Sequence, residues 1–410
     1  MNRKRVVVLG ATGSIGESAR KVARDIPERM EIVGLAAHRS ASKLAEQANE
    51  LRPEAVCIVD ETKVDELRGA LQYAPQILVG EEGLCEIAAL ASAEMVLVAV
   101  VGTGGLRPAL AAMAAGKDLA VASKEILVMA GAIVMNAAAA NNVRVLPVDS
   151  EHNAIFQCLI GKRPTSNAQR STFNADASMV DVERWTLDVS DVRRLILTAS
   201  GGPFRTTPVS EFDAITPEQA LRHPTWNMGP KVTIDSATLF NKGLEMIEAR
   251  WLFNVEMPRV DVVIHPQSIV HSMVEFTDGS VLAQMSHSDM CFPIQYAVTW
   301  PERVPNSLAP LDFGKLRQLD FETPRYHDFP ALHLAREAGE TGGTLPAVLN
   351  AANEVAVAAF LEKRISFPGI WQLVAEVMSR HTSIADASLD AILAADQWAR
   401  AEAASVVRAH

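Results

Sequence analysis

Cysteine is scarce in this sequence: the 410 residues include four cysteines, and no two of them form a CxxC pair. The sequence therefore indicates neither a zinc site nor a disulfide framework, and reduced thiols in a cytoplasmic protein are the simpler interpretation. A long basic block is also missing, and the net charge is −11. This charge argues against a nucleic-acid-binding surface, so a negatively charged ligand would need a local basic pocket.

Long hydrophobic runs are absent as well. The apolar stretch at 95–102 is too short to cross a bilayer. The apolar run at 6–9 follows a basic start but ends at once in a glycine pattern, which predicts a first β-strand and no export signal. We therefore expect no membrane segment and a cytoplasmic location. Because 410 residues exceed what one hydrophobic core usually serves, we expect two or three domains.

Residues 1–148 alternate short apolar runs with helical segments, such as those at 42–51 and 107–115. The predicted strands lie at 6–9, 31–36, 55–59, 76–79, 95–101, 119–122 and 144–147. They are rich in Val, Ile and Leu on both faces, as parallel strands covered by helices must be. This pattern predicts an α/β fold that begins with a Rossmann-like nucleotide-binding domain.

Three further regions follow along the chain. Residues 149–288 mix strands, predicted at 194–198, 260–264, 272–276 and 280–284, with loops rich in glycine and proline, which predicts a central α/β domain. Within it, we expect a lid at 200–230 and a polar surface insertion without chemical importance at 161–192. The proline-rich residues 289–313 predict an extended connector, and residues 314–410 predict a C-terminal α-helical domain.

The segment GATGSIG at 10–16 directly follows the first predicted strand and opens a helix. Glycines in such a turn let backbone N–H groups approach a pyrophosphate at the helix N-terminus. The spacing is GxxGxxG and so departs from the GxGxxG pattern. The alternative is a tight turn that binds no ligand. Because a strand precedes the turn and a helix follows it, we favour a dinucleotide site.

Arg39 lies where the second predicted strand ends, between His38 and Ser40. A site for NADH usually has an acidic residue at this position, which binds the ribose 2′-hydroxyl. An arginine instead suits a 2′-phosphate by charge and by bidentate geometry. This residue therefore favours NADPH, although a solvated arginine at a strand end is a common alternative.

Two carboxylates stand two residues apart at Asp149 and Glu151. If the segment is extended, both side chains face the same side and can converge on one hard cation. Oxygen ligands suit Mg²⁺ or Mn²⁺ better than zinc. The alternative is a helix start capped by Asp149 or Ser150. Glu245 stands four residues after Asn241 on a helical stretch and could supply a third carboxylate.

Donors suited to a phosphate monoester stand close by in the sequence, at Ser200, Ser236, Asn241 and Lys242. Trp226 lies between a proline and a glycine, which indicates a mobile aromatic lid rather than a core residue. The triplet Ser123-Lys124-Glu125 follows a strand of the first domain, at the edge where ligands bind in open α/β sheets. The alternative for this triplet is an exposed Lys–Glu pair that starts a helix.

Six motifs in order resemble the 1-deoxy-D-xylulose 5-phosphate reductoisomerase family: GATGSIG, ASKEILV, LPVDSEHNAIFQ, SGGPF, RHPTWNMG and DSATLFNKGLEMIEARWLF. HPQSIVHSMVEF and LNAANEVAVAAF also match, so the likeness covers nearly the whole chain except 161–192. The resemblance implies that the chain rearranges this phosphorylated sugar and reduces the product with NADPH to 2-C-methyl-D-erythritol 4-phosphate. That step commits carbon to the non-mevalonate isoprenoid pathway. A homodimer is implied as well.

The resemblance also implies roles for individual residues. Metal ligands for Mg²⁺ or Mn²⁺ are Asp149, Glu151 and Glu245. Substrate contacts are Lys124, Ser150, Glu151, Ser200, His223, Trp226, Ser236, Asn241, Lys242 and Glu245. The residues expected to be catalytic are Lys124, Asp149, Glu151, His223 and Glu245. Cofactor contacts are Thr12, Gly13, Ser14, Ile15, His38, Arg39, Ser40, Ser123, Glu125 and Gly229. Lys124 is expected to stabilise developing negative charge without forming a Schiff base.

Some positions depart from the family pattern. Ser123 stands where many relatives have Asn, and His38-Arg39-Ser40 replaces a Gly-Lys-Asn version. His265 and His271 could form a metal pair, but the resemblance favours a structural role in a sheet near the dimer interface. The rearrangement itself stays open between a retro-aldol/aldol route and an α-ketol shift.

Two other functions compete with this interpretation. A semialdehyde dehydrogenase would need an acylating cysteine, for which Cys158 and Cys291 lack a suitable setting. An NADPH-sensing regulator would have no use for metal and phosphate ligands together.

Overall fold

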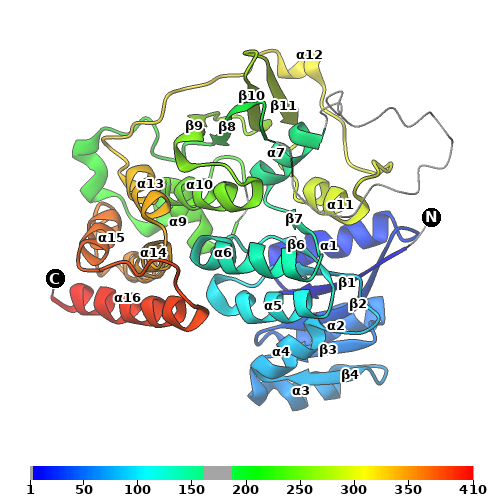
Figure 1. The fold of residues 1–410 in the computed structure, drawn as a ribbon. Helices are drawn as coiled ribbons and strands as arrows, with labels where there is room; N and C mark the ends of the chain where they lie inside the picture. The colour runs from blue at the N-terminus through cyan, green and yellow to red at the C-terminus, as the bar shows by residue number, and fades with distance from the viewer. Residues whose placement is uncertain (1–2, 161–186, 188, 227, 410) are drawn as a thin grey trace.

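The computed structural model describes residues 3–160, 187, 189–226 and 228–409 (Figure 1). A parallel sheet of seven strands, in the order β4-β3-β2-β1-β5-β6-β7, forms the N-terminal part. Its strands are β1 (Lys4–Leu9), β2 (Met30–Ala37), β3 (Ala55–Ile58), β4 (Gln76–Val79), β5 (Met95–Val98), β6 (Asp118–Val121) and β7 (Val145–Pro147). Each predicted strand is present, although β5 ends three residues early. The chain leaves the sheet after Val98, and Val101 is 77% exposed.

Helices cover both faces of this sheet, as parallel strands require. They are α1 (Ser14–Asp25), α2 (Ala41–Leu51), α3 (Val64–Ala70), α4 (Gly80–Ala88), α5 (Leu106–Ala114) and α6 (Glu125–Ala140), with short 3₁₀ turns η1 (Glu61–Lys63) and η2 (Gly102–Gly105). Val6, Val7 and Val8 of the central strand β1 are fully buried. The Rossmann-like architecture expected for the first part of the chain is therefore confirmed.

The middle of the chain forms a second, smaller sheet of four strands in the order β11-β10-β8-β9. Its strands are β8 (Val192–Ala199), β9 (Val260–Ile264), β10 (Val270–Phe276) and β11 (Val281–Met285). The helical segments are α7 (Ser150–Ile160), η3 (Val209–Ala214), α8 (Pro217–Ala220), α9 (Pro230–Thr238), α10 (Phe240–Phe253) and η4 (Met257–Arg259). Helices α7 and α10 pack on this sheet on the side toward the first domain (Figure 1).

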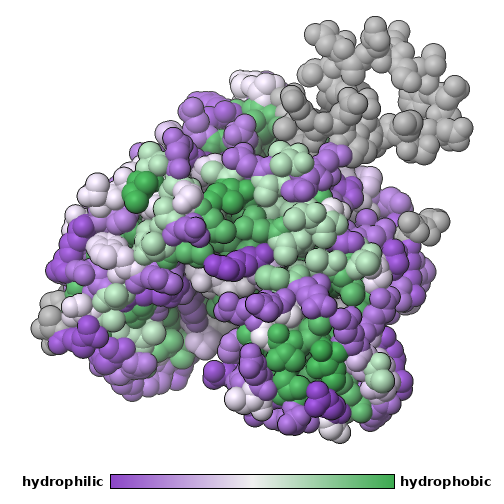
Figure 2. Space-filling view, turned by 60° about the horizontal axis from the view of Figure 1, so that its bottom comes forward, coloured by the Kyte–Doolittle hydropathy of each residue, from purple (hydrophilic) through white to green (hydrophobic). Residues whose placement is uncertain are grey.

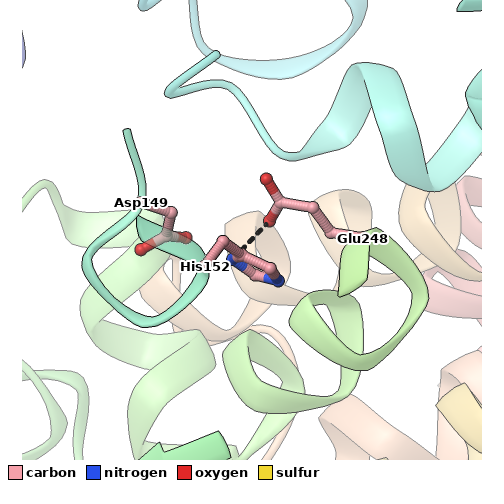
Figure 3. A group of neighbouring side chains, drawn as sticks. All are labelled: Asp149, His152 and Glu248. Atoms are coloured by element: carbon pink, nitrogen blue, oxygen red, sulfur yellow. Dashed lines mark ion pairs between the residues drawn. The ribbon is translucent and has the colours of Figure 1, made fainter. Parts of the chain in front are cut away.

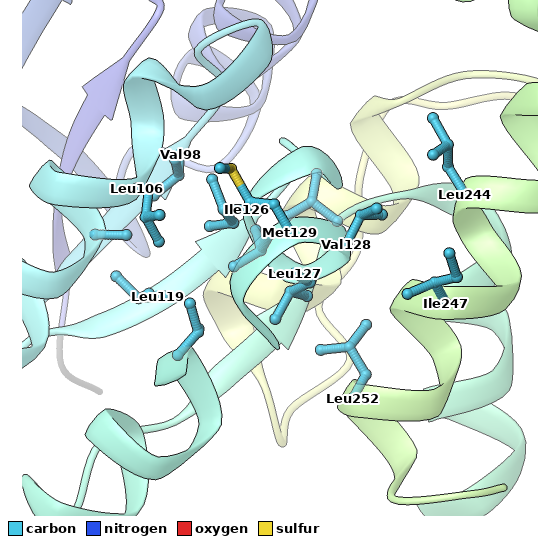
Figure 4. Close-up of a cluster of buried hydrophobic side chains, with 14 of the residues drawn as sticks. Val98, Leu106, Leu119, Ile126, Leu127, Val128, Met129, Leu244, Ile247 and Leu252 are labelled. Carbon is cyan, nitrogen blue, oxygen red and sulfur yellow. The ribbon is translucent and has the colours of Figure 1, made fainter. Parts of the chain in front are cut away.

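Helix α6 joins the two α/β parts through a continuous hydrophobic cluster (Figure 4). Ile126 and Met129 face Val98 and the helix α5, whereas Val128 lies on the side of Ile247 on α10. All five side chains are buried. Since Lys124 and Glu125 stand at the start of α6, this packing sets where both residues lie.

The C-terminal part is helical, as expected, and consists of α11 (Cys291–Thr299), α12 (Phe313–Leu316), α13 (Ala331–Thr341), α14 (Leu345–Leu361), α15 (Gly369–Ser379) and α16 (Leu389–Ala409). The prediction of an extended connector at 289–313 is wrong for its first part. Helix α11 forms there and packs against α1. Pro293 does not prevent this helix because it lies in the first turn, where backbone N–H groups have no partner within the helix.

Hydrophilic residues cover much of the face in Figure 2, and hydrophobic side chains gather in its centre and at its lower right. Among the described residues, no helix is long and apolar enough to cross a membrane. The surface insertion predicted at 161–192 lies outside the described residues except for its last part, which leads into β8.

Candidate active site

A pocket of about 380 Å³ lies where the first two parts of the chain meet. Its walls come from the start of α1, the start of α7, the loop before α9, the start of α10 and strand β10. The pocket therefore gathers the glycine turn and the predicted metal and phosphate segments, which are far apart in the sequence, around one cavity.

Three carboxylates converge at one end of the pocket. Asp149, Glu151 and Glu245 each offer an oxygen, and these oxygens lie within 4.8 Å of one another. Two lysines bind this group: Lys124 Nζ lies 2.5 Å from Asp149 Oδ2 and 2.9 Å from Glu245 Oε1. Lys242 Nζ lies 2.7 Å from Glu151 Oε1 and also contacts Glu245. We call these five residues the lysine-paired group.

Charge balance within the lysine-paired group explains its pKa values. Burial alone would raise the pKa of Glu151, but Lys242 and Lys124 hold it far below its ordinary value. Burial raises the pKa of Glu245 to about 7, and the Glu151 carboxylate adds to the rise while the two lysines oppose it. The oxygen-only donor set matches what a hard divalent cation prefers. A cation bound here would relieve the repulsion that the two ammonium groups otherwise relieve.

Asp149 and Glu151 do not converge through an extended segment, as the sequence had suggested. Ser150 begins α7, so both carboxylates lie at a helix start, which was the alternative prediction. The Asn153 N–H donates to the Asp149 carbonyl at 2.8 Å and closes the first turn. The helix N-terminus favours negative charge. The oxygens of the two carboxylates still converge with that of Glu245.

The predicted relation between Asn241 and Glu245 is correct. Both lie on α10, and Asn241 Nδ2 donates to Glu245 Oε1 at 2.5 Å. Glu245 is fully buried and so depends on such donors. Asn241 and Lys242 therefore bind the carboxylates in this structure while also lining the pocket.

Three predicted phosphate donors meet at a second point of the pocket. His223 Nε2 lies 3.0 Å from the hydroxyl oxygen of Ser200 and 3.0 Å from that of Ser236. His223 Nδ1 accepts backbone N–H groups from Thr225 and Trp226, which leaves the proton of the neutral ring on Nε2. Burial lowers the pKa of His223 to about 4, so the ring is neutral at physiological pH.

Trp226 covers the pocket next to His271. Their rings contact edge to face with centroids 6.1 Å apart, and both side chains line the cavity. The hydroxyl of the neighbouring Thr225 lies 3.2 Å from that of Ser268, in the loop between β9 and β10. Trp226 therefore faces a ligand cavity and not the core of a domain.

The glycine turn has the form that the sequence predicted. Gly10 has a φ of 87°, and a Cβ on it would lie 2.2 Å from the Ala99 carbonyl oxygen, so only glycine fits. Two side chains of α2 hold the turn: Gln47 donates to the Ala11 carbonyl and Lys43 to the Thr12 carbonyl. Because a peptide C=O and the next N–H point in opposite directions, the Thr12 N–H points away from α2.

The predicted cofactor residues fall into three sets. Ser14, Ile15 and Gly229 line the pocket, and Thr12 and Gly13 lie in the adjoining turn. Arg39 lies 70% exposed at the end of β2, with Nε 3.7 Å from Asp60 Oδ2, between His38 and Ser40. Ser123 and Glu125 form the last set, and both bind other residues of the protein. The Ser123 hydroxyl donates to the Val100 carbonyl, and Glu125 forms an ion pair with Lys231.

A second group of possible metal ligands shares Asp149 with the first. Asp149, His152 and Glu248 also offer ligand atoms within 4.8 Å of one another (Figure 3). His152 Nδ1 lies 3.3 Å from Glu248 Oε2, and His152 Nε2 lies 2.9 Å from the Glu245 carbonyl oxygen. His152 and Glu248 are fully buried. We call these three residues the histidine group.

No lysine contacts Glu248 among the described ion pairs, and neither of its oxygens has a hydrogen-bond donor there. Burial, together with the Asp149 carboxylate, raises the pKa of Glu248 well above its ordinary value. Burial lowers the pKa of His152 to about 4. Both shifts favour the neutral form of the side chain concerned. Figure 3 shows their contact, a distance of 3.3 Å between His152 Nδ1 and Glu248 Oε2, and among the described residues neither atom has a hydrogen-bond partner.

Sequence reasoning missed several residues of the pocket. His265 has the structural role that was expected, since its Nδ1 lies 2.8 Å from the Asp320 carbonyl oxygen. His271 does not fit that expectation, because it lines the pocket. No local pattern could have found it, because the residues of β10 are buried almost without alternation and the sequence does not show which of them face a cavity. The cysteines that a semialdehyde dehydrogenase would need are buried, and burial raises the pKa of Cys158 to about 11 and that of Cys291 to about 12.

A Rossmann-like sheet beside a pocket with converging carboxylates and hydrogen-bond donors suited to a phosphate is typical of a dinucleotide- and metal-dependent enzyme that acts on small phosphorylated molecules. Residues 6–131 match the 1-deoxy-D-xylulose 5-phosphate reductoisomerase family, and residues 145–253 and 285–402 match two C-terminal domains described for the same enzyme. The chain belongs to the 1-deoxy-D-xylulose 5-phosphate reductoisomerase family.

Relatives of this name are similar over their full length. The protein of Symbiobacterium thermophilum is 50% identical over 97% of this chain and 97% of its own. That of Chlorobium limicola is 48% identical over 98% of this chain and 100% of its own. The Zymomonas mobilis enzyme, solved with NADPH, superposes with a TM-score of 0.86 at 42% identity and covers 99% of both chains. A reductoisomerase solved with NADPH, fosmidomycin and magnesium has a TM-score of 0.87 at 37% identity and covers 99% of this chain and 98% of its own.

Proposed function

We propose that this chain rearranges 1-deoxy-D-xylulose 5-phosphate and reduces the product with NADPH to 2-C-methyl-D-erythritol 4-phosphate, using Mg²⁺ or Mn²⁺. The observation that supports this most is the pocket, which joins the glycine turn, a three-carboxylate group and a cluster of phosphate donors. Family membership supplies the particular substrate and cofactor.

Asp149, Glu151 and Glu245 would hold the metal, since their oxygens already converge within 4.8 Å. A bound divalent cation supplies Lewis-acid polarisation of the substrate's carbonyl and hydroxyl oxygens. Lys124 is then freed from Asp149 and Glu245 and can face the developing negative charge, as expected for a lysine that forms no Schiff base. Ser150 and Glu151 would contact the carbon backbone of the substrate.

Ser200, His223, Ser236, Asn241 and Lys242 would bind the phosphate. The neutral His223 ring presents its Nε2–H between the hydroxyls of Ser200 and Ser236, so these three side chains offer uncharged hydrogen-bond donors, and Lys242 supplies the positive charge. The lid at 200–230 would then close Trp226 over the substrate. Closure matters on either route of rearrangement, because fragments must be retained and the aldehyde must meet hydride away from water.

NADPH would bind along the glycine turn, with the Thr12 N–H and the start of α1 at the pyrophosphate. Contacts to the cofactor are proposed for Thr12, Gly13, Ser14, Ile15, His38, Arg39, Ser40, Ser123, Glu125 and Gly229. Arg39 is the proposed ligand of the 2′-phosphate, and its high exposure leaves its guanidinium accessible. Asp60 would compete with that phosphate and is the nearest anion to Arg39 among the described ion pairs.

A homodimer and a cytoplasmic location stay part of the proposal. Strand β11 is an edge of the four-stranded sheet, and its Val281 and Leu282 are 46% and 44% exposed. Such an edge suits pairing with a second copy. Light scattering of the wild type and of Leu282→Lys tests this: we expect a dimer that the lysine weakens, and a monomeric wild type would contradict it.

The test of the activity is oxidation of NADPH, followed at 340 nm, with 1-deoxy-D-xylulose 5-phosphate and with or without Mn²⁺. We expect turnover that requires both the sugar phosphate and the metal, and product of the mass of 2-C-methyl-D-erythritol 4-phosphate. Omission of the sugar controls for other oxidation of NADPH. A folded, NADPH-binding protein without turnover in Mn²⁺ or Mg²⁺ would contradict the proposal.

A further inference from the structure

The motif LNAANE at 349–354 lies on α14 in the C-terminal helical domain, far along the chain from every proposed ligand. Asn350 and Asn353 of this motif are fully buried. Burying an amide is unfavourable unless it is hydrogen-bonded, so each of these side chains needs a partner. Helix α14 packs against α6 and α9 (Figure 1). The described partners of the two amide groups lie on α9 and on α14 itself.

Asn353 reaches across to α9. Its Nδ2 donates to Asp235 Oδ1 at 2.8 Å, and the other oxygen of that carboxylate lies 2.8 Å from Lys231 Nζ. Lys231 Nζ in turn lies 3.5 Å from Glu125 Oε1. Asp235 is 1% exposed and Glu125 6%, so water does little to screen these contacts. The result is a continuous polar chain from α14 through α9 to α6.

Electrostatic attraction stabilises this polar chain of side chains. Burial alone would lower the pKa of Lys231, but Asp235 and Glu125 raise it above its ordinary value. The ammonium group therefore stays charged and serves two carboxylates at once. Without the Asn353 amide, one oxygen of the buried Asp235 would lose its donor, which weakens the geometry of the whole chain.

This polar chain connects residues that lie next to the proposed active site. Glu125 follows Lys124 at the start of α6, and Lys231 follows Gly229 and Pro230, where the proposed lid ends. Asp235 precedes Ser236, whose hydroxyl meets His223. Three points around the pocket are thus tied to one asparagine of the C-terminal domain.

We propose that Asn353, Asp235 and Lys231 form a positioning relay, through which the C-terminal helical domain holds the lid exit and the start of α6 in register for NADPH. These are positioning residues, since none of them lines the pocket. The inference rests on the proposed function, because it assigns the relay to the cofactor side of that site.

Asn353→Asp tests the relay, because it sets a second carboxylate against Asp235. We expect the Kd of NADPH, measured by fluorescence without substrate, to rise about tenfold, with a fall of about tenfold in kcat/KM. Adding Asp235→Asn to this variant restores a donor–acceptor pair between positions 235 and 353 and keeps an oxygen that can bind Lys231. The double variant should therefore return to within about threefold of the wild type.

Asn350→Asp is the matched control. Asn350 lies on the same helix, is equally buried, and donates to Glu354 at 3.0 Å, so the variant also buries a carboxylate against a carboxylate. Glu354 is held by Arg400 at 2.8 Å, and it raises the pKa of Lys231 less than Asp235 and Glu125 do, so NADPH affinity should change much less than in Asn353→Asp. Thermal melts report the stability loss that both variants share.

Equal loss of NADPH affinity in the two variants, or no rescue by Asp235→Asn, would overturn the relay. If Asn353→Asp does not fold, Asn353→Ser and Asn350→Ser carry the same comparison without added charge. Because NADPH binding is measured without substrate, the relay is tested even if the wild type fails to turn over 1-deoxy-D-xylulose 5-phosphate. That failure would count against the proposed function alone.

Discussion

The lysine-paired group and the histidine group share Asp149, which directly precedes α7, and each takes one further residue from α7 and a glutamate from α10, yet their surroundings differ. Glu245 and Glu248 stand one helical turn apart and are both fully buried. Glu245 forms ion pairs with Lys124 and Lys242 and accepts a hydrogen bond from Asn241. The described polar contacts of Glu248 include only the imidazole of His152.

This difference decides what each group can bind. Ammonium groups keep Glu151 ionised and limit the pKa rise of Glu245, so a cation that displaces them finds charged oxygens. Burial raises the pKa of Glu248 and lowers that of His152, which favours the neutral form of both side chains, and their contact links α7 to α10. Two similar sets of side chains thus differ in what they suit: the lysine-paired group is the proposed metal site, and we expect the histidine group to position it.

The largest effect is expected from Glu245→Gln. Losing one charged ligand should lower metal-dependent turnover by about 10³-fold, or roughly 4 kcal/mol in the activation barrier. NADPH binding should be unchanged, because none of the proposed NADPH contacts lies on α10. Steady-state kinetics across a Mn²⁺ titration and NADPH fluorescence measure the two effects. Turnover near that of the wild type would exclude Glu245 as a ligand.

Lys124→Met would make the lysine-paired group resemble the histidine group. Asp149 and Glu245 lose their shared ammonium, and the substrate loses a cation near its developing charge. We expect kcat to fall about 10²-fold. Phosphate-end binding, measured as the KM of the sugar phosphate, should change much less. A variant that loses only affinity for the phosphate would contradict the proposed role of Lys124.

How far the sequence predicts these groups depends on how local each signal is. The glycine turn and the strands were predictable, because period and punctuation are local properties. The convergence of Asp149, Glu151 and Glu245 was also predicted, although through an extended segment where the structure has a helix start. The roles of individual site residues stay predictions.

The histidine group was not predicted, because His152 and Glu248 meet only when α7 packs beside α10. Likewise, no spacing in the sequence relates Asn353 to Asp235, which lie 118 positions apart. The lysines that neutralise the carboxylates were assigned to substrate alone, since sequence cannot show which anion a lysine faces before its ligand binds. Tertiary packing supplies what local pattern lacks.

Metal affinity should depend on pH through Glu245. Its pKa of about 7 means that a proton competes with the metal below neutrality, so the apparent affinity falls as the pH falls. Between pH 7 and pH 6 we expect a weakening of up to about tenfold. Calorimetric titration of Mn²⁺ at pH 6 and pH 8 measures this, and Glu245→Gln should remove that dependence. Equal affinities at the two pH values would contradict the assignment.

Glu248→Gln should have the smallest effect and separates the two groups most directly. A glutamine keeps the shape of the carboxyl and its contact with His152, so we expect turnover to fall by less than about tenfold. The raised pKa of Glu248 stabilises the folded state at low pH, and that stability is lost as the pH rises from about 4.5 toward the folded-state value. The glutamine carries no such proton, so its melting temperature should gain on that of the wild type as the pH rises. A loss of turnover as large as that of Glu245→Gln would instead make Glu248 a metal ligand and merge the two groups into one site.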